Sequence, residues 1–153
     1  MTQKKDGLSE LTGETERFDL TIDTEAVARA ESIIAALGDE YLEWLRGDLG
    51  QLDTSLSQAR GSVRAVDDLR RKAHEIRGQG GSFGFPMISQ VADALHILPE
   101  AQDGFLDADG EAIGRELLAL MRRLAEDQGS ENAALVAEAE RAADRVRLEY
   151  GDA

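Results

Sequence analysis

The stretch that decides the fold covers residues 63–84 and reads VRAVDDLRRKAHEIRGQGGSFG. At about 100° of rotation per residue, its apolar residues fall on one face of a helix. These residues are Val66, Leu69, Ala73, Ile76 and Phe83. Ser62 is a suitable N-cap and Gly84 a suitable stop, so the pattern predicts an amphipathic helix over residues 63–83. His74 falls about 120° from the centre of the apolar face, so we expect its side chain to be exposed.

Glycines and arginines surround His74 on this helix. Gly78 and Gly81 follow it along the same outward strip, and Arg70 and Arg77 border that strip. An internal glycine costs a helix about 1 kcal/mol relative to alanine, and packing does not explain glycines that face outward. Bare backbone beside an exposed histidine would let another protein close over the imidazole. A helix that already ends at Arg77 is the alternative.

Apolar residues recur at helical spacing through most of the remaining chain. The further predicted helices cover residues 23–38, 39–56, 86–98, 111–127 and 131–150. Gly38 and Pro99 are taken as helix ends, and no segment alternates as a strand would. Short connections between amphipathic helices predict an all-α protein: an antiparallel four-helix bundle with additional N- and C-terminal helices.

Three segments are expected along the chain. Residues 1–17 are polar and predict a flexible tail, residues 18–128 the helical bundle, and residues 129–153 an extra C-terminal helix packed on the bundle or extending it. Hydrophobic residues make up 42% of the chain but aromatic residues only 5%. The core is therefore expected to be built mainly from leucine, alanine, valine and isoleucine.

Charge and composition exclude several classes of function. The net charge is −14, which argues against a nucleic acid as partner. Residues 61–85 are the exception, with five basic and three acidic side chains, so the segment around His74 is a basic island. The chain has no cysteine, which excludes thiol chemistry and disulfides. No apolar run is long enough for a membrane span, so the sequence predicts a cytoplasmic protein with no membrane partner.

The motif from His74 to Gly84 resembles the signature of histidine-containing phosphotransfer (HPt) domains. That signature is His-x-x-(Lys/Arg)-Gly, followed five residues later by an apolar residue and a glycine. His74 corresponds to the phosphorylated histidine, Arg77 to the basic residue one turn later, Gly78 to the glycine beside the imidazole and Gly84 to the closing glycine. Arginine in place of the commoner lysine, and the pair Gly80-Gly81, are departures from the usual pattern.

The resemblance implies a relay function in a two-component phosphorelay. His74 would accept a phosphoryl group from the aspartate of a response-regulator receiver domain and pass it to another receiver, with a hybrid histidine kinase upstream. Arg77 would stabilise the added charge, because a guanidinium remains protonated. The docking surface would include Arg70, Gly78, Gly81, Ser82 and Gly84. No cofactor or metal is expected on this chain, because Mg²⁺ would be held by the receiver.

Other interpretations fit the motif less well. His74-Glu75-Ile76-Arg77 also matches the start of the histidine-kinase H-box, but the Thr-Pro that should follow is absent, which leaves a degenerate, kinase-derived dimeric phosphotransferase as an alternative. A zinc hydrolase of the His-Glu-x-x-His type fails because Gly78 occupies the second histidine position. A purely structural helical adaptor also remains open. His96, between apolar neighbours, is expected to be a half-buried packing residue.

Overall fold

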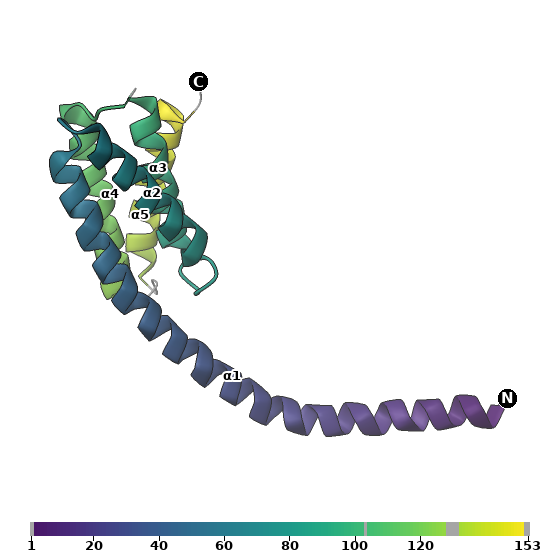
Figure 1. The fold of residues 1–153 in the computed structure, drawn as a ribbon. Helices are drawn as coiled ribbons and strands as arrows, with labels where there is room; N and C mark the ends of the chain where they lie inside the picture. The colour runs from purple at the N-terminus through teal and green to yellow at the C-terminus, as the bar shows by residue number, and fades with distance from the viewer. Residues whose placement is uncertain (1, 103, 128–131, 152–153) are drawn as a thin grey trace. The chain divides into compact units, whose positions relative to one another are not determined.

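The structure, a computed structural model, describes residues 2–102, 104–127 and 132–151, with side chains from residue 23 onward. Within these residues it contains five helices and no strand (Figure 1). They are α1 (Thr2–Gln58), α2 (Val63–Gly80), α3 (Pro86–Ala101), α4 (Ala108–Glu126) and α5 (Ala133–Tyr150). The predicted all-α fold class is confirmed. None of the helices in this part of the chain is both long enough and apolar enough for a membrane span.

The chain divides into two compact units, residues 1–37 and residues 38–153. The predicted break at Gly38 is wrong, because α1 continues through this residue. A single glycine costs a helix only about 1 kcal/mol, and good helix formers stand on both sides of it. The predicted tail over residues 1–17 stays a prediction, since these side chains lie outside the described residues. The boundaries predicted at residues 17 and 128 also stay predictions.

The second unit is a helical bundle around one aliphatic core. The apolar residues of the predicted helix 39–56 are buried in it: Tyr41, Leu42, Leu45, Leu49, Leu52 and Leu56. The buried residues of α2, α3 and α4 join the same cluster. The last helix, α5, packs against α3 and α4 and adds Leu135, Ala139 and Val146 to the core. Four helical segments with an added C-terminal helix therefore share one interior, as the sequence predicts.

The C-terminal ends of α2 and α3 differ from the predicted ones. The second helix ends at Gly80 rather than Phe83, and residues 81–84 form turns. Phe83 still packs on the bundle, because its ring stacks on Tyr41 with centroids 4.7 Å apart. The third helix runs through Pro99 to Ala101. Proline is tolerated there because it removes only one hydrogen bond close to the helix end, while its ring is buried in the core.

The connection between α2 and α3 fixes how these helices meet. Gly84 adopts a left-handed backbone with φ of +88°, a conformation that glycine reaches without steric cost. The backbone amide of Phe85 donates to the carbonyl of Gly80 at 2.7 Å, which closes the turn. Pro86 stands in the first turn of α3, as the sequence predicts. This tight connection brings the C-terminal half of α2 against α3.

Candidate functional site

His74 lies on the solvent side of α2. The helix begins at the Ser62 cap, whose hydroxyl accepts a hydrogen bond from the Ala65 amide at 3.1 Å. The buried residues of α2 are Ala65, Val66, Leu69, Ala73, Ile76 and Gly80. His74 is exposed, in agreement with the rotation predicted from the sequence. One face of α2 is therefore buried in the bundle, and the opposite face exposes the His74 imidazole to solvent.

A second histidine lies beside the first. The ring centroids of His74 and His96 are 5.5 Å apart, with the ring planes inclined by 44°. The same shallow groove is lined by Asp67, Arg70 and Arg71. His96 is half-buried as predicted, but it is also part of the site, which the sequence analysis missed. The sequence could have indicated this contact, because His74 and His96 each stand eleven residues from Phe85. If the chain turns at Phe85 between two antiparallel helices, residues equally far from the turn come side by side.

Burial controls the protonation of His96. Loss of solvation lowers the pKa of His96 below the ordinary histidine value, while the Glu100 carboxylate opposes this shift. The positive charges of Arg77 and His74 lower the His96 pKa further, and Asp93 raises it. Burial therefore favours the uncharged form of the His96 ring. A neutral imidazole next to His74 can donate or accept one hydrogen bond without adding charge to the groove.

Arg77 is already engaged by α3. Its Nη1 lies 2.9 Å from Oδ1 of Asp93. The other oxygen of this carboxylate lies 3.4 Å from Nε of Arg147, on α5. Asp93 thus joins three helices by bridging two guanidinium groups. Arg77 has the predicted position one turn after His74, but its charge is shared with Asp93.

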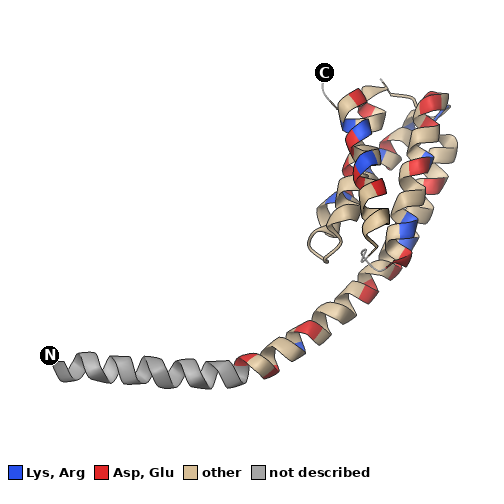
Figure 2. Ribbon diagram, turned by 180° about the vertical axis from the view of Figure 1, so that it is seen from behind, with Lys and Arg blue, Asp and Glu red and all other residues tan. Residues whose placement is uncertain are grey.

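Arg70 also carries ion pairs at the edge of the groove. Its guanidinium lies 3.0 Å from Asp67 on the same helix and 4.0 Å from Glu100 on α3. Acidic and basic residues are interspersed along the helices of the bundle (Figure 2). At these partly exposed positions each pair contributes about 1 kcal/mol or less. These arginines can therefore exchange partners at low cost.

The glycines after His74 have different roles. A Cβ at Gly78 would meet no atom within 4 Å, so the space beside this residue is open. A Cβ at Gly80 would collide with the Ser89 hydroxyl and lie 3.0 Å from the Phe85 carbonyl oxygen. Gly80 therefore permits close contact between α2 and α3, whereas Gly78 keeps the outer surface low. Gly81 is the C-cap residue of α2, not an interior residue as predicted.

Ser89 fastens the end of α2 to α3. Its hydroxyl donates to the carbonyl of Arg77 at 2.8 Å and accepts from the amide of Gly81 at 2.9 Å. Both groups belong to the last turn of α2, where backbone groups lose their helical partners. Ser82 and Gly84 follow in the exposed turn. Ser89 therefore holds the backbone that carries Arg77, Gly78 and Gly81, and the sequence analysis did not single it out.

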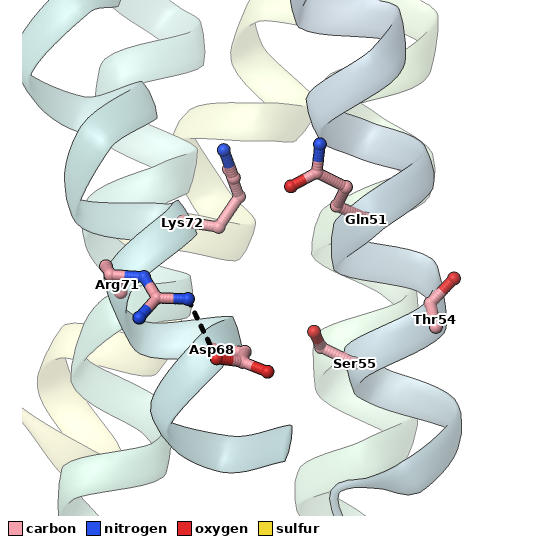
Figure 3. A pocket seen from close by; sticks show the side chains of 6 residues that line it. All are labelled: Gln51, Thr54, Ser55, Asp68, Arg71 and Lys72. Carbon is pink, nitrogen blue, oxygen red and sulfur yellow. Dashed lines mark hydrogen bonds and ion pairs between the residues drawn. The ribbon is translucent and has the colours of Figure 1, made fainter. Parts of the chain in front are cut away.

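A second groove lies between α1 and α2 (Figure 3). Its lining residues are Gln51, Thr54, Ser55, Asp68, Arg71 and Lys72. Both cations are paired: Arg71 lies 2.8 Å from Asp68, and Lys72 lies 3.2 Å from Asp48 and 2.9 Å from Glu75. Neither histidine reaches this groove. It borders the surface of α2 but contains no imidazole.

Residues 25–148 match the family model described as Hpt domain. The chain belongs to the Hpt domain family. The match covers most of the chain and includes the greater part of α5. This helix is therefore part of the region that matches the family model. The family resemblance predicted from the His74 motif is confirmed. Neither the curated proteins nor the solved structures gave a match to this chain.

Membership in the Hpt family gives the chain a place in histidine phosphotransfer within phosphorelays. The site agrees with that chemistry in having an exposed imidazole on a rigid helix with cationic groups beside it. Across residues 23–102, 104–127 and 132–151, no group of three or more histidine, aspartate or glutamate side chains is arranged to hold a metal ion. The groove of this Hpt domain presents the two imidazoles and the guanidinium groups of Arg70 and Arg71 beside the Asp67 carboxylate.

Proposed function

We propose that His74 is the phosphoacceptor of this Hpt domain. The observation that carries the proposal is the exposed imidazole on α2, which stands in a groove with Arg70, Arg71 and His96. An unprotonated ring nitrogen is a nucleophile, and nearby guanidinium groups stabilise phosphoryl charge. The partner is a response-regulator receiver domain in the cytoplasm, fed by a hybrid histidine kinase.

The transfer exchanges one bond to phosphorus for another. The lone pair of the His74 nitrogen forms a bond to phosphorus while the bond from phosphorus to the receiver's aspartate oxygen breaks. The aspartate leaves as a carboxylate, and the ring proton of His74 stays on the other nitrogen. Passing the group to a second receiver reverses these steps. The receiver would supply Mg²⁺, so this chain supplies the nucleophile and the surface on which the receiver docks.

Four features support a docking surface around His74. Gly78 leaves open space beside the imidazole, and Gly81, Ser82 and Gly84 form a low, exposed end to α2. Arg70 borders the groove on the other side of the histidine. Arg77 is the phosphate-stabilising residue in this proposal, and it exchanges Asp93 for the phosphoryl group. Because Arg147 also pairs with Asp93, the carboxylate keeps a cationic partner during that exchange.

The test is transfer from a phosphorylated receiver domain, followed as acid-labile and base-stable phosphate on this chain. The wild-type chain should become labelled and His74→Gln should not. His96→Gln should still become labelled, because the label belongs to position 74 and not to its neighbour. Label retained on His74→Gln would contradict the assignment. No transfer from any receiver of the source organism would favour a structural adaptor instead.

A further inference from the structure

Arg147 on α5 lies against the carboxylate that holds Arg77. Its Nε is 3.4 Å from Oδ2 of Asp93, and Nη1 of Arg77 is 2.9 Å from the other oxygen of the same carboxylate. One carboxylate thus serves two guanidinium groups that come from different helices. Each cation offsets part of the negative charge that attracts the other one. Arg147 therefore weakens the hold of Asp93 on Arg77.

The guanidinium of Arg147 is fixed at all three of its nitrogens. Besides the contact of Nε with Asp93, Nη2 donates to the backbone carbonyl of Gln90 at 3.1 Å, and Nη1 lies 3.0 Å from Oδ1 of Asp144. Gln90 and Asp93 are one turn apart on α3, so the guanidinium spans a turn of that helix. A planar fork with three partners keeps its place when one of them changes. Arg147 is therefore the fixed cation beside Asp93.

Arg77 is the cation that can leave Asp93. Its side chain retains 42% of its accessible surface, against 31% for Arg147, and Asp93 is its one ion-pair partner among the described residues. It stands one turn after His74 on α2. A phosphoryl group on that histidine would compete with the carboxylate for the guanidinium, because both are anions. How much of Arg77 reaches the phosphoryl group depends on how strongly Asp93 holds it.

We propose that Arg147 is a positioning residue: by pairing with Asp93, it leaves Arg77 free to turn to a phosphoryl group on the proposed phosphoacceptor. The inference rests on the proposed function and adds α5 to the elements that control the site. Without Arg147, the carboxylate has a single cation and holds Arg77 more tightly. The phosphohistidine then loses its cationic partner and hydrolyses faster, which is the opposite of the effect expected when Asp93 is removed.

Hydrolysis of a chemically phosphorylated chain tests this inference without a receiver. Phosphoramidate is the donor: the ring nitrogen forms a bond to phosphorus, and ammonia leaves. The chain has two histidines, so every variant also carries His96→Gln, which leaves position 74 as the single acceptor. After removal of the donor, Arg147→Gln should lose the label about two- to fivefold faster, the range expected for one partly exposed ion pair. Arg147→Lys keeps the charge and should bring the rate back towards the original one.

Two further variants separate positioning from a purely structural role. Arg145→Gln removes the same charge from α5 at a residue that pairs with Glu116, 3.4 Å away, and should lose the label at the unaltered rate. Adding Arg147→Gln to Asp93→Asn should leave the slow hydrolysis of Asp93→Asn unchanged, because Arg147 acts through that carboxylate.

Equal rates in Arg147→Gln and Arg145→Gln, or an effect of Arg147→Gln that persists in Asp93→Asn, would overturn the positioning role alone. A chain that phosphoramidate does not label would contradict the accessible nucleophile at position 74, and would overturn the proposed function together with this inference.

Discussion

The rings of His74 and His96 face one groove with centroids 5.5 Å apart, although 22 residues separate them in the sequence. One ring is exposed on α2 and the other is half-buried on α3. Their contact gives the proposed phosphoacceptor a neighbour that is neutral because it is partly desolvated. The chemical state of His96 should therefore respond to what happens at His74.

Phosphorylation of His74 should raise the pKa of His96. In the unmodified chain, burial and then the charges of Arg77 and His74 lower this pKa, against the effect of Glu100. A phosphoryl group adds negative charge within reach of the imidazole and favours its protonated form. Titration of the His96 ring by NMR, with and without phosphate on His74, measures the shift. An unchanged His96 pKa would show that the phosphoryl group lies away from this ring.

The stability of the bundle should fall as pH drops below the ordinary histidine range. Burial holds the pKa of His96 below the ordinary histidine value of 6.5, so the unfolded chain binds the proton more readily than the folded one. The stability from neutral His96 is complete above about pH 6.5 and is lost as pH falls through its lower folded pKa. Denaturant midpoints of wild type and His96→Gln between pH 5 and pH 8, in steps of about half a unit, should converge at low pH.

Alanine at two neighbouring glycines should have opposite effects. Gly80→Ala forces a Cβ against Ser89 and the Phe85 carbonyl oxygen, and overpacking of this kind costs about 1–3 kcal/mol. Gly78→Ala meets open space and should raise stability by up to about 1 kcal/mol, the helix preference of alanine over glycine. Urea unfolding measures both changes. The Gly78 variant should nevertheless accept phosphate more slowly, because its methyl group stands on the docking surface.

Removal of the Asp93 carboxylate should release Arg77 at a small cost in stability. Asp93→Asn loses ion pairs to Arg77 and Arg147 at partly exposed positions, worth about 1 kcal/mol or less each. The released Arg77 should pair more fully with a phosphoryl group on His74, so the phosphohistidine should hydrolyse more slowly. Decay of the label after removal of the receiver measures this.

The matched control for that variant is Asp144→Asn. It removes a carboxylate that lies 3.0 Å from Nη1 of Arg147, and it leaves the pair between Arg77 and Asp93 in place. The label should then decay at the wild-type rate. Equal decay in Asp93→Asn and Asp144→Asn would mean that Arg77 does not exchange partners.

Tyr41→Phe should stabilise the bundle. The Tyr41 hydroxyl is buried, burial raises its pKa to about 12, and it has no hydrogen-bond partner among the described residues. An unsatisfied buried hydroxyl costs about 1–3 kcal/mol, while the ring contacts with Phe83 and Phe85 would be retained. Thermal unfolding should show a higher midpoint. A lower midpoint would mean that the hydroxyl has a partner in solution.

The sequence predicted which face of a helix is buried wherever the apolar pattern was strong. The stripe from Tyr41 to Leu56 and the face of α2 around Leu69 are buried as predicted, because a 3.6-residue period can bury only one side of a helix. The sequence predicted the ends of helices less accurately than their buried faces. Gly38 and Pro99 carry local penalties of a few kcal/mol at most, and continued helix on both sides outweighed them.

The sequence by itself determined the family motif, the all-helical class and the exposed position of His74, because all three depend on residues within a few helical turns. Only the tertiary structure brought His96 to His74, Asp93 to Arg77 and Ser89 to the end of α2. Those contacts join different helices, and their partners are set by how α2, α3 and α5 pack rather than by spacing along one helix. The environment of the proposed phosphoacceptor is therefore a property of the assembled bundle.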